Sequence, residues 1–327
     1  YTKTAFEVYM ENHLEMATLA SRYDLAMEAT ALLRGDANRD IPGVKEELRQ
    51  IGSVDIHTIT IMDEIGEKLM GKKRGRYITL AIPMLQDGKT LTEVAAITAE
   101  ELRKLLPPLK NGGLLAVGLG NNQAIADSLG PRVIAQTYAT RHLPAEATQF
   151  CPICTLAPGV LGITGIETAE ILKGVLDHVQ PAAMLVVDSL AASSVSRVGT
   201  TIQMAENGIS PGSGIGNTRQ IINSETMGIP VIAIGVPTVV SALSIIRETT
   251  GSLCRYWQSL QQAMPQTTPA AITYVEQNLL EAFSGSLMVT PKDIDELIAQ
   301  VAELLAAAIA MAIHPAAAIT NYHDFIR

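Results

Sequence analysis

The sequence predicts an α/β fold, a three-layer α/β/α sandwich built around a mixed, mostly parallel sheet. Three short apolar runs, at residues 114–117, 184–187 and 231–234, carry this prediction. Helix-like sequence precedes each run, and buried strands that alternate with helices form a largely parallel sheet covered on both faces. The composition is that of a globular protein, since 47% of the 327 residues are hydrophobic and 17% are charged.

Further elements flank these runs. Residues 54–62 and 76–82 are rich in β-branched residues that partly alternate with polar ones, which predicts two neighbouring strands that are not fully buried. Residues 92–106 and 165–179 are predicted to be helical, the first ending before a pair of prolines. Residues 286–289 are predicted to add a strand, followed by a C-terminal helix.

Charge and cysteine content indicate where such a chain works. The formal charge of −9 argues against nucleic acid as a partner, because phosphate contacts need clustered Lys and Arg. Three cysteines fit a reducing compartment better than a disulfide scaffold. Residues 1–30 lack the apolar core of a signal peptide, and the apolar stretch at 301–313 is shorter than the roughly 20 residues that span a bilayer. We therefore expect a cytoplasmic protein with no membrane partner.

Several familiar motifs are incomplete. The glycine-rich segments 118–123 and 212–217 lack the last glycine of a dinucleotide-binding loop, and no phosphate-binding Gly-Lys-Ser/Thr follows them. Cys151 and Cys154 have the spacing of a zinc or redox pair, but no second ligand pair matches them. No His-Glu-x-x-His motif is present, and no Gly-x-Ser-x-Gly pattern directly follows a predicted strand. We therefore predict no metal, no cofactor and no serine or cysteine nucleophile.

Two aspartates stand out. Asp188 directly follows the apolar run 184–187, and Asp127 lies downstream of the glycine-rich turn at 118–120. Both fall near carboxyl ends of predicted strands, where α/β proteins place their sites. Two neighbouring carboxyl groups do not both ionise readily, so one of them keeps a proton and the pair divides acid and base roles. Either aspartate is equally consistent with a helix cap or a turn residue.

Long sequence motifs surround these aspartates. They are residues 71–77 (GKKRGRY), 118–121 (GLGN), 127–131 (DSLGP), 140–143 (TRHL), 158–168 (PGVLGITGIET), 188–192 (DSLAA), 208–217 (GISPGSGIGN), 228–238 (GIPVIAIGVPT) and 287–292 (LMVTPK). Together these segments resemble the germination protease family of spore-forming bacteria. The resemblance covers most of the chain from about residue 22 and is highly specific, because it rests on many motifs.

The resemblance implies an endopeptidase that degrades small acid-soluble spore proteins during germination, in the spore core. It implies that Asp127 and Asp188 are the catalytic pair, that the chain assembles as a homotetramer, and that the fold is similar to that of hydrogenase-maturation peptidases.

The resemblance also implies a precursor. Residues 22–28 resemble the stretch where the family's precursor cuts itself, and the family cleaves after an acidic residue that precedes an apolar residue and Ala. Asp24-Leu25-Ala26 has this form. Residues 1–24 would then be a propeptide and residues 25–327 a single peptidase domain, although Tyr23 stands where the family has Thr.

An acidic substrate residue needs a positive subsite. Arg132, Arg141 and Arg197 are candidates because each lies close to a matched motif and a guanidinium suits a carboxylate. Each is also consistent with an ordinary surface ion pair. Two other functions remain open: a metal-dependent peptidase in which Asp127, Asp188 and a His hold an ion, and a non-catalytic binding module whose aspartates are caps.

Overall fold

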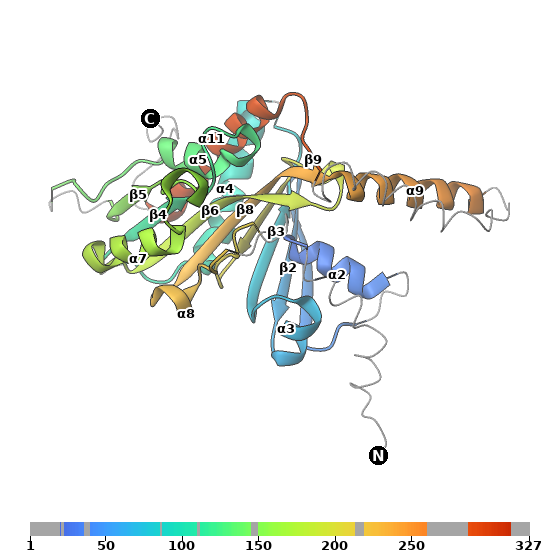
Figure 1. The fold of residues 1–327 in the computed structure, drawn as a ribbon, viewed down its shortest axis with the longest axis horizontal. Helices are drawn as coiled ribbons and strands as arrows, with labels where there is room; N and C mark the ends of the chain where they lie inside the picture. The colour runs from blue at the N-terminus through green and yellow to red at the C-terminus, as the bar shows by residue number, and fades with distance from the viewer. Residues whose placement is uncertain are drawn as a thin grey trace, which may run out of the picture.

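The structure is a computed structural model that describes residues 20, 23–35, 40–85, 87–109, 112–144, 150–212, 219–259 and 287–314. Among these residues a single nine-stranded sheet runs through the molecule, with helices on both of its faces (Figure 1). The strand order is β1-β2-β3-β7-β8-β6-β4-β5, and β9 pairs with β8. The predicted α/β sandwich with a mixed sheet is confirmed. The sheet is not mostly parallel as expected, because five of its strand pairs are antiparallel and three are parallel.

The strands divide into two halves. The pairs β8–β6, β6–β4 and β4–β5 are parallel, whereas β1, β2, β3 and β7 pair antiparallel with one another in that order and β7 joins β8 antiparallel. The strand bounds are β1 Val44–Ile51, β2 Val54–Ile61, β3 Gly75–Ala81, β4 Leu114–Gly118, β5 Ile153–Leu156, β6 Ala183–Ala192, β7 Thr201–Ala205, β8 Val231–Ser241 and β9 Met288–Val289.

Parallel pairing is thus found where the three apolar runs predicted it. Those runs lie in β4, β6 and β8, each of which is buried over most of its length. The antiparallel half follows from short connections, because a tight turn at Gly52 (φ 56°) joins β1 to β2 as a hairpin. Its exposed edge strand β1 carries charged residues, which discourages pairing with other chains.

Helices cover both faces of the sheet. The face formed by α4, α5 and α11 holds the largest apolar core, and α2, α3, α7 and α8 cover the opposite face. The helix bounds are α2 Ala26–Arg34, α3 Glu64–Met70, α4 Gly88–Leu105, α5 Leu129–Gln136, α6 Leu161–Thr164, α7 Thr168–Val179, α8 Ser224–Met227, α9 Ala242–Ser259 and α11 Ile294–Ile313, with 3-10 turns η2 Ile125–Asp127 and η3 Val195–Arg197.

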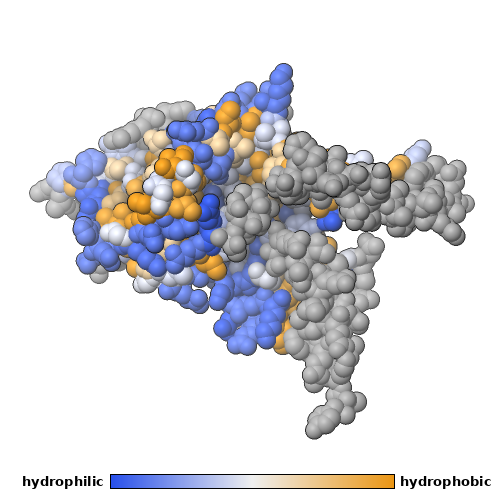
Figure 2. Space-filling view, viewed as in Figure 1, coloured by the Kyte–Doolittle hydropathy of each residue, from blue (hydrophilic) through white to orange (hydrophobic). Residues whose placement is uncertain are grey.

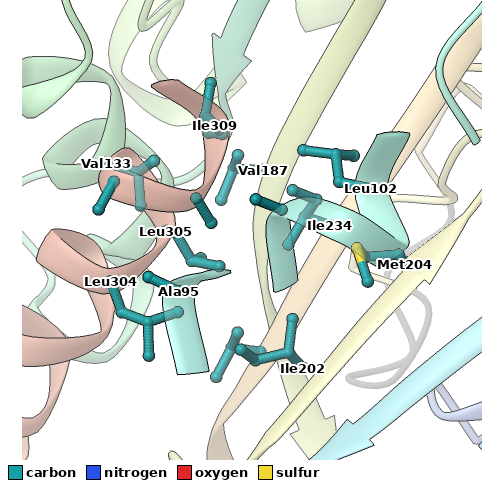
Figure 3. Close-up of a cluster of buried hydrophobic side chains, with 14 of the residues drawn as sticks. Ala95, Leu102, Val133, Val187, Ile202, Met204, Ile234, Leu304, Leu305 and Ile309 are labelled. Carbon is teal, nitrogen blue, oxygen red and sulfur yellow. The ribbon is translucent and has the colours of Figure 1, made fainter. Parts of the chain in front are cut away.

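The C-terminal helix α11 is the centre of the main core. Figure 3 shows Leu304, Leu305 and Ile309 of this helix in one apolar cluster with Ala95 of α4 and Val187 of β6. By length and composition alone α11 qualifies as a membrane span, yet 67% of its most apolar window is buried inside the molecule. The helix is therefore the buried core helix that the apolar stretch at 301–313 predicts.

A close approach of backbones fixes α5 against the sheet. A Cβ atom added at Gly130, in the first turn of α5, would lie 2.6 Å from the carbonyl oxygen of Val187 in β6 and closer still to that of Leu119. Gly118 at the end of β4 faces the carbonyl of Gly130 in the same way. Only glycine fits at both positions, and their contact sets the start of α5 directly beside Asp127 and Asp188.

Candidate active site

Asp188 lies inside β6, at the point where this parallel strand emerges from the core. Four buried apolar residues precede it, and the backbone pairs it with Gly235 of β8. Only 6% of the residue is exposed. Its Oδ1 accepts a hydrogen bond of 2.9 Å from the backbone N–H of Ser189. The carboxyl group is therefore held at the carboxyl edge of the sheet with little access to water.

Asp127 ends the turn that follows β4. Its Oδ2 accepts a 2.8 Å hydrogen bond from the backbone N–H of Asn121, which closes the turn onto itself. Gly120, with a φ of 114°, lets the backbone of Asp127 approach closely. The hydroxyl of Thr238 in β8 donates to the carbonyl of Ala126 at 2.6 Å. These contacts hold Asp127 near the carboxyl end of β4, on the same side of the sheet edge as Asp188.

The two aspartates line one cavity of about 430 Å³, together with Asp24, Thr238 and Arg219. Burial raises the pKa of Asp188 well above its ordinary value, and the nearby carboxylates of Asp127 and Asp24 raise the pKa further. Burial also raises the pKa of Asp127, but the hydrogen bond from Asn121 opposes this. The arrangement keeps the proton on Asp188 and leaves Asp127 as the more easily ionised partner.

The burial of Asp188 is expected to make the stability of the folded protein depend on pH. Because the pKa of Asp188 in the folded protein lies above its ordinary value of 3.8, the folded state keeps a proton that the unfolded state releases. Stability falls as pH rises from about 4 through the folded pKa. Asp188→Asn still accepts the Ser189 hydrogen bond without ionising, so its advantage in unfolding free energy over the wild type should grow with pH. Urea unfolding of both chains at pH 4.5 and 7.5 measures this, and an advantage that is equal at both pH values would contradict it.

Asp24 of the predicted processing site lines this same cavity. The carboxylate of Asp24 accepts a 3.0 Å hydrogen bond from the backbone N–H of Ala191, three residues beyond Asp188 on β6. Glu28 in α2 binds the N–H of Ser193 at 2.9 Å in the same manner. Leu25 between them is completely buried. The N-terminal segment therefore lies across the strand end that carries Asp188.

The three candidate arginines do not reach the cavity. Arg132 on α5 turns toward α11 and pairs with Asp295 at 3.1 Å, and Arg197 pairs with Glu28 at 3.5 Å. Arg141 acts electrostatically on Cys154, at the far edge of the sheet in β5. Closeness to a motif along the chain therefore did not translate into closeness to the cavity in space.

Arg219 is the cavity arginine that sequence reasoning missed. It lies 3.6 Å from Glu167, and both residues line the cavity with Asp127 and Asp188. Its only sequence signal is its position after the glycine-rich segment 208–217, part of which lies outside the described residues. In the described part of the chain no group of three or more His, Cys, Asp or Glu residues is placed to hold a metal.

An α/β protein with two coupled carboxyl groups at the carboxyl ends of parallel strands has the site of an acid–base enzyme. Sequence comparison gives its family. A profile described as germination protease matches residues 21–282. The germination protease of Caldanaerobacter subterraneus is 40% identical over 91% of this chain and 95% of its own length, and that of Bacillus subtilis is 35% identical over 93% and 96%. The chain belongs to the germination protease family, and it is a spore germination endopeptidase.

A solved structure is also similar to this chain. A NiFe hydrogenase maturation protease from Thermococcus kodakarensis covers 64% of the chain with 98% of its own length, at 13% identity and a TM-score of 0.30.

Proposed function

We propose that this endopeptidase hydrolyses peptide bonds with Asp127 as general base and Asp188 as general acid. The observation that carries the proposal is the shared cavity, in which a deeply buried carboxyl group with a raised pKa lies beside a carboxylate that hydrogen bonds hold in place. When two carboxyl groups differ in pKa, the one with the higher pKa keeps its proton and acts as the acid, and the other acts as the base. Asp127 draws a proton from water, the water oxygen attacks the carbonyl carbon, and Asp188 protonates the leaving nitrogen.

The substrates that we propose are small acid-soluble spore proteins, cut after an acidic residue in the spore core. The way in which the cavity holds Asp24 supports this preference. The backbone N–H of Ala191 donates a hydrogen bond to the Asp24 carboxylate, and the Lys72 ammonium adds a positive charge nearby. Backbone donors and a lysine can take a substrate Glu or Asp in the same manner. We propose this subsite, formed by the Ala191 N–H and Lys72, in place of the arginine subsite expected from the sequence.

Apolar side chains near the cavity suit the residue that follows the cleaved bond. Val160 and Leu161 line the cavity, and Ile163 and Ile166 close by are exposed. Figure 2 shows a group of apolar residues on the left-hand part of this face, whereas hydrophilic residues cover α3. An apolar substrate residue gains about 25 cal/mol for each Å² of surface that such a rim removes from water.

We further propose that residues 1–24 are a propeptide, that residues 25–327 are the mature domain, and that the mature chain works as a homotetramer. Asp24 occupies the cavity that a substrate would enter, and its contact with Ala191 holds it beside Asp188. A chain in this state is expected to be inactive toward other proteins until its own Asp24–Leu25 bond is cut. Most of the propeptide lies outside the described residues.

Self-processing of the purified chain tests this proposal. Incubation at mildly acidic pH should yield a product that begins at Leu25, because the family resemblance and the docked Asp24 point to the same bond. N-terminal sequencing and intact mass identify the new terminus, and Asp188→Asn serves as the uncut control. A product with any other first residue, or equal processing of the Asp188→Asn chain, would contradict the proposal.

A further inference from the structure

The carbonyl oxygen of Asp24 accepts two hydrogen bonds from side chains that no step above uses. Lys72 donates from Nζ at 3.1 Å and Gln203 from Nε2 at 3.0 Å. Lys72 also donates to the carbonyl of Tyr23 at 2.7 Å, and the Oε1 of Gln203 accepts from the N–H of Ala26 at 2.6 Å. The two side chains therefore bind the main chain on both sides of the Asp24–Leu25 bond.

These donors and the two aspartates line two different cavities that share Asp24. Asp24 lines the 430 Å³ cavity with Asp127 and Asp188, and it also lines a second cavity of about 410 Å³ whose walls include Lys72 and Gln203. Asp24 thus lines both the cavity of the acid–base pair and the cavity of the two N–H donors. Hydrolysis of an amide needs both kinds of group, because the attacking water and the carbonyl oxygen need different partners.

Lys72 is held where it is by its loop. The helix α3 ends at Gly71 in the left-handed conformation (φ 61°), which turns the chain toward the sheet. Asn207 donates from Nδ2 to the carbonyls of Lys73 at 2.9 Å and Arg74 at 3.1 Å, and the hydroxyl of Tyr77 donates to that of Lys73 at 2.9 Å. Donors fixed before reaction stabilise developing charge without a cost of reorganisation.

Gln203 is equally constrained. It lies on β7 between Thr79 of β3 and Gly235 of β8, and only 8% of the residue is exposed. Among the described residues, the hydrogen bonds of its amide go to main-chain atoms of Ala26 and Asp24, so they depend on the position of the backbone. Burial lowers the pKa of Lys72, while Asp24 and Glu28 raise it. Burial is the larger of these effects, so the pKa of Lys72 lies below its ordinary value.

We propose that Lys72 and Gln203 form the oxyanion site for cleavage of the Asp24–Leu25 bond, an inference that rests on the proposed function. Water attacks the carbonyl carbon of Asp24 and gives one proton to Asp127. The carbonyl oxygen becomes an oxyanion held by Lys72 Nζ and Gln203 Nε2. The bond to nitrogen then breaks as Asp188 gives its proton to the Leu25 nitrogen, leaving a carboxyl group on Asp24 and an amine on Leu25.

The test compares self-processing rates of the full-length chain with single substitutions. Lys72→Met should slow processing by on the order of 10²- to 10³-fold, the usual effect of losing one oxyanion donor. Lys72→Arg, which keeps a donor and the charge, should retain more of the rate than Lys72→Met. Lys173→Met is the matched control, because Lys173 lies exposed on α7 and lines neither cavity. It should process within about twofold of the wild-type rate.

The outcomes separate the two proposals. If wild type cuts itself, Asp188→Asn does not, and a folded Lys72→Met chain cuts at the wild-type rate, the oxyanion site is wrong while the aspartate pair stands. If Asp188→Asn also cuts itself, the proposed function is wrong. Circular dichroism checks folding, and Gln203→Leu replaces Lys72→Met where that chain does not fold. A folded Gln203→Leu chain that processes at the wild-type rate likewise overturns the inference.

Discussion

Asp127→Asn and Asp188→Asn, each made in the form that begins at Leu25, are expected to lose peptide cleavage by on the order of 10³-fold or more. Positioned acid–base groups each contribute about 10²- to 10⁴-fold to a rate. Asn at 127 cannot take a proton from water, although it still accepts the hydrogen bond from Asn121. Asn at 188 has no proton of comparable acidity to give to the leaving nitrogen.

The control for this pair is Asp177→Asn. Asp177 lies exposed on α7, on a helix that covers the sheet but contributes to the cavity only through its first residues. It should cleave at the wild-type rate, measured as initial rate on a peptide that contains Thr-Glu-Phe-Ala. A folded Asp127→Asn or Asp188→Asn chain that keeps the full rate would make that aspartate structural.

Gly130→Ala is expected to destabilise the folded protein by about 3 kcal/mol or more. Overpacking a closed site costs about 1–3 kcal/mol when side chains can yield, and here the added carbon meets backbone atoms of Leu119 and Val187. Relief requires α5 to move away from β6, which also shifts Asp127 relative to Asp188. We therefore expect the cleavage rate to fall even in the fraction of molecules that remains folded.

Gly174→Ala is the matched comparison for this substitution. Gly174 lies inside α7, and nothing lies within 4 Å of a Cβ atom added there. Alanine in a helix interior is about 0.5–1 kcal/mol more favourable than glycine, so this chain should be slightly more stable than the wild type. Urea unfolding measures both variants. Equal stabilities of the Gly130→Ala and Gly174→Ala chains would contradict the close approach.

Much of the architecture followed from sequence periodicity. The runs at 114–117, 184–187 and 231–234 predicted β4, β6 and β8, because strands buried on both faces need uninterrupted apolar residues. The order of the strands in the antiparallel half could not be predicted from the sequence. Its strands alternate, so the sequence indicated β2 and β3 as neighbours without revealing that β7 joins them to the parallel half.

The aspartates were also visible, because Asp188 follows the apolar run of β6 and Asp127 ends the turn after β4, near the edge where such folds place sites. Their partners were not. Lys72 follows a helix, Gln203 lies in a strand and Arg219 follows a glycine-rich segment, and nothing in the spacing of these residues predicts that they surround Asp24 and Asp188. Tertiary contacts such as the hydrogen bond between Asp24 and Gln203, which are 179 positions apart, carry that information, and a single sequence does not.

Cleavage of the Thr-Glu-Phe-Ala peptide by the form that begins at Leu25, followed by mass spectrometry with and without a metal chelator, tests the central claim most directly. The two-aspartate mechanism predicts a single cut after Glu, at the same rate in both conditions, and no product from the folded Asp127→Asn and Asp188→Asn chains. A rate that collapses on chelation, and returns when a divalent metal is added, would contradict it and assign these carboxylates to a metal site.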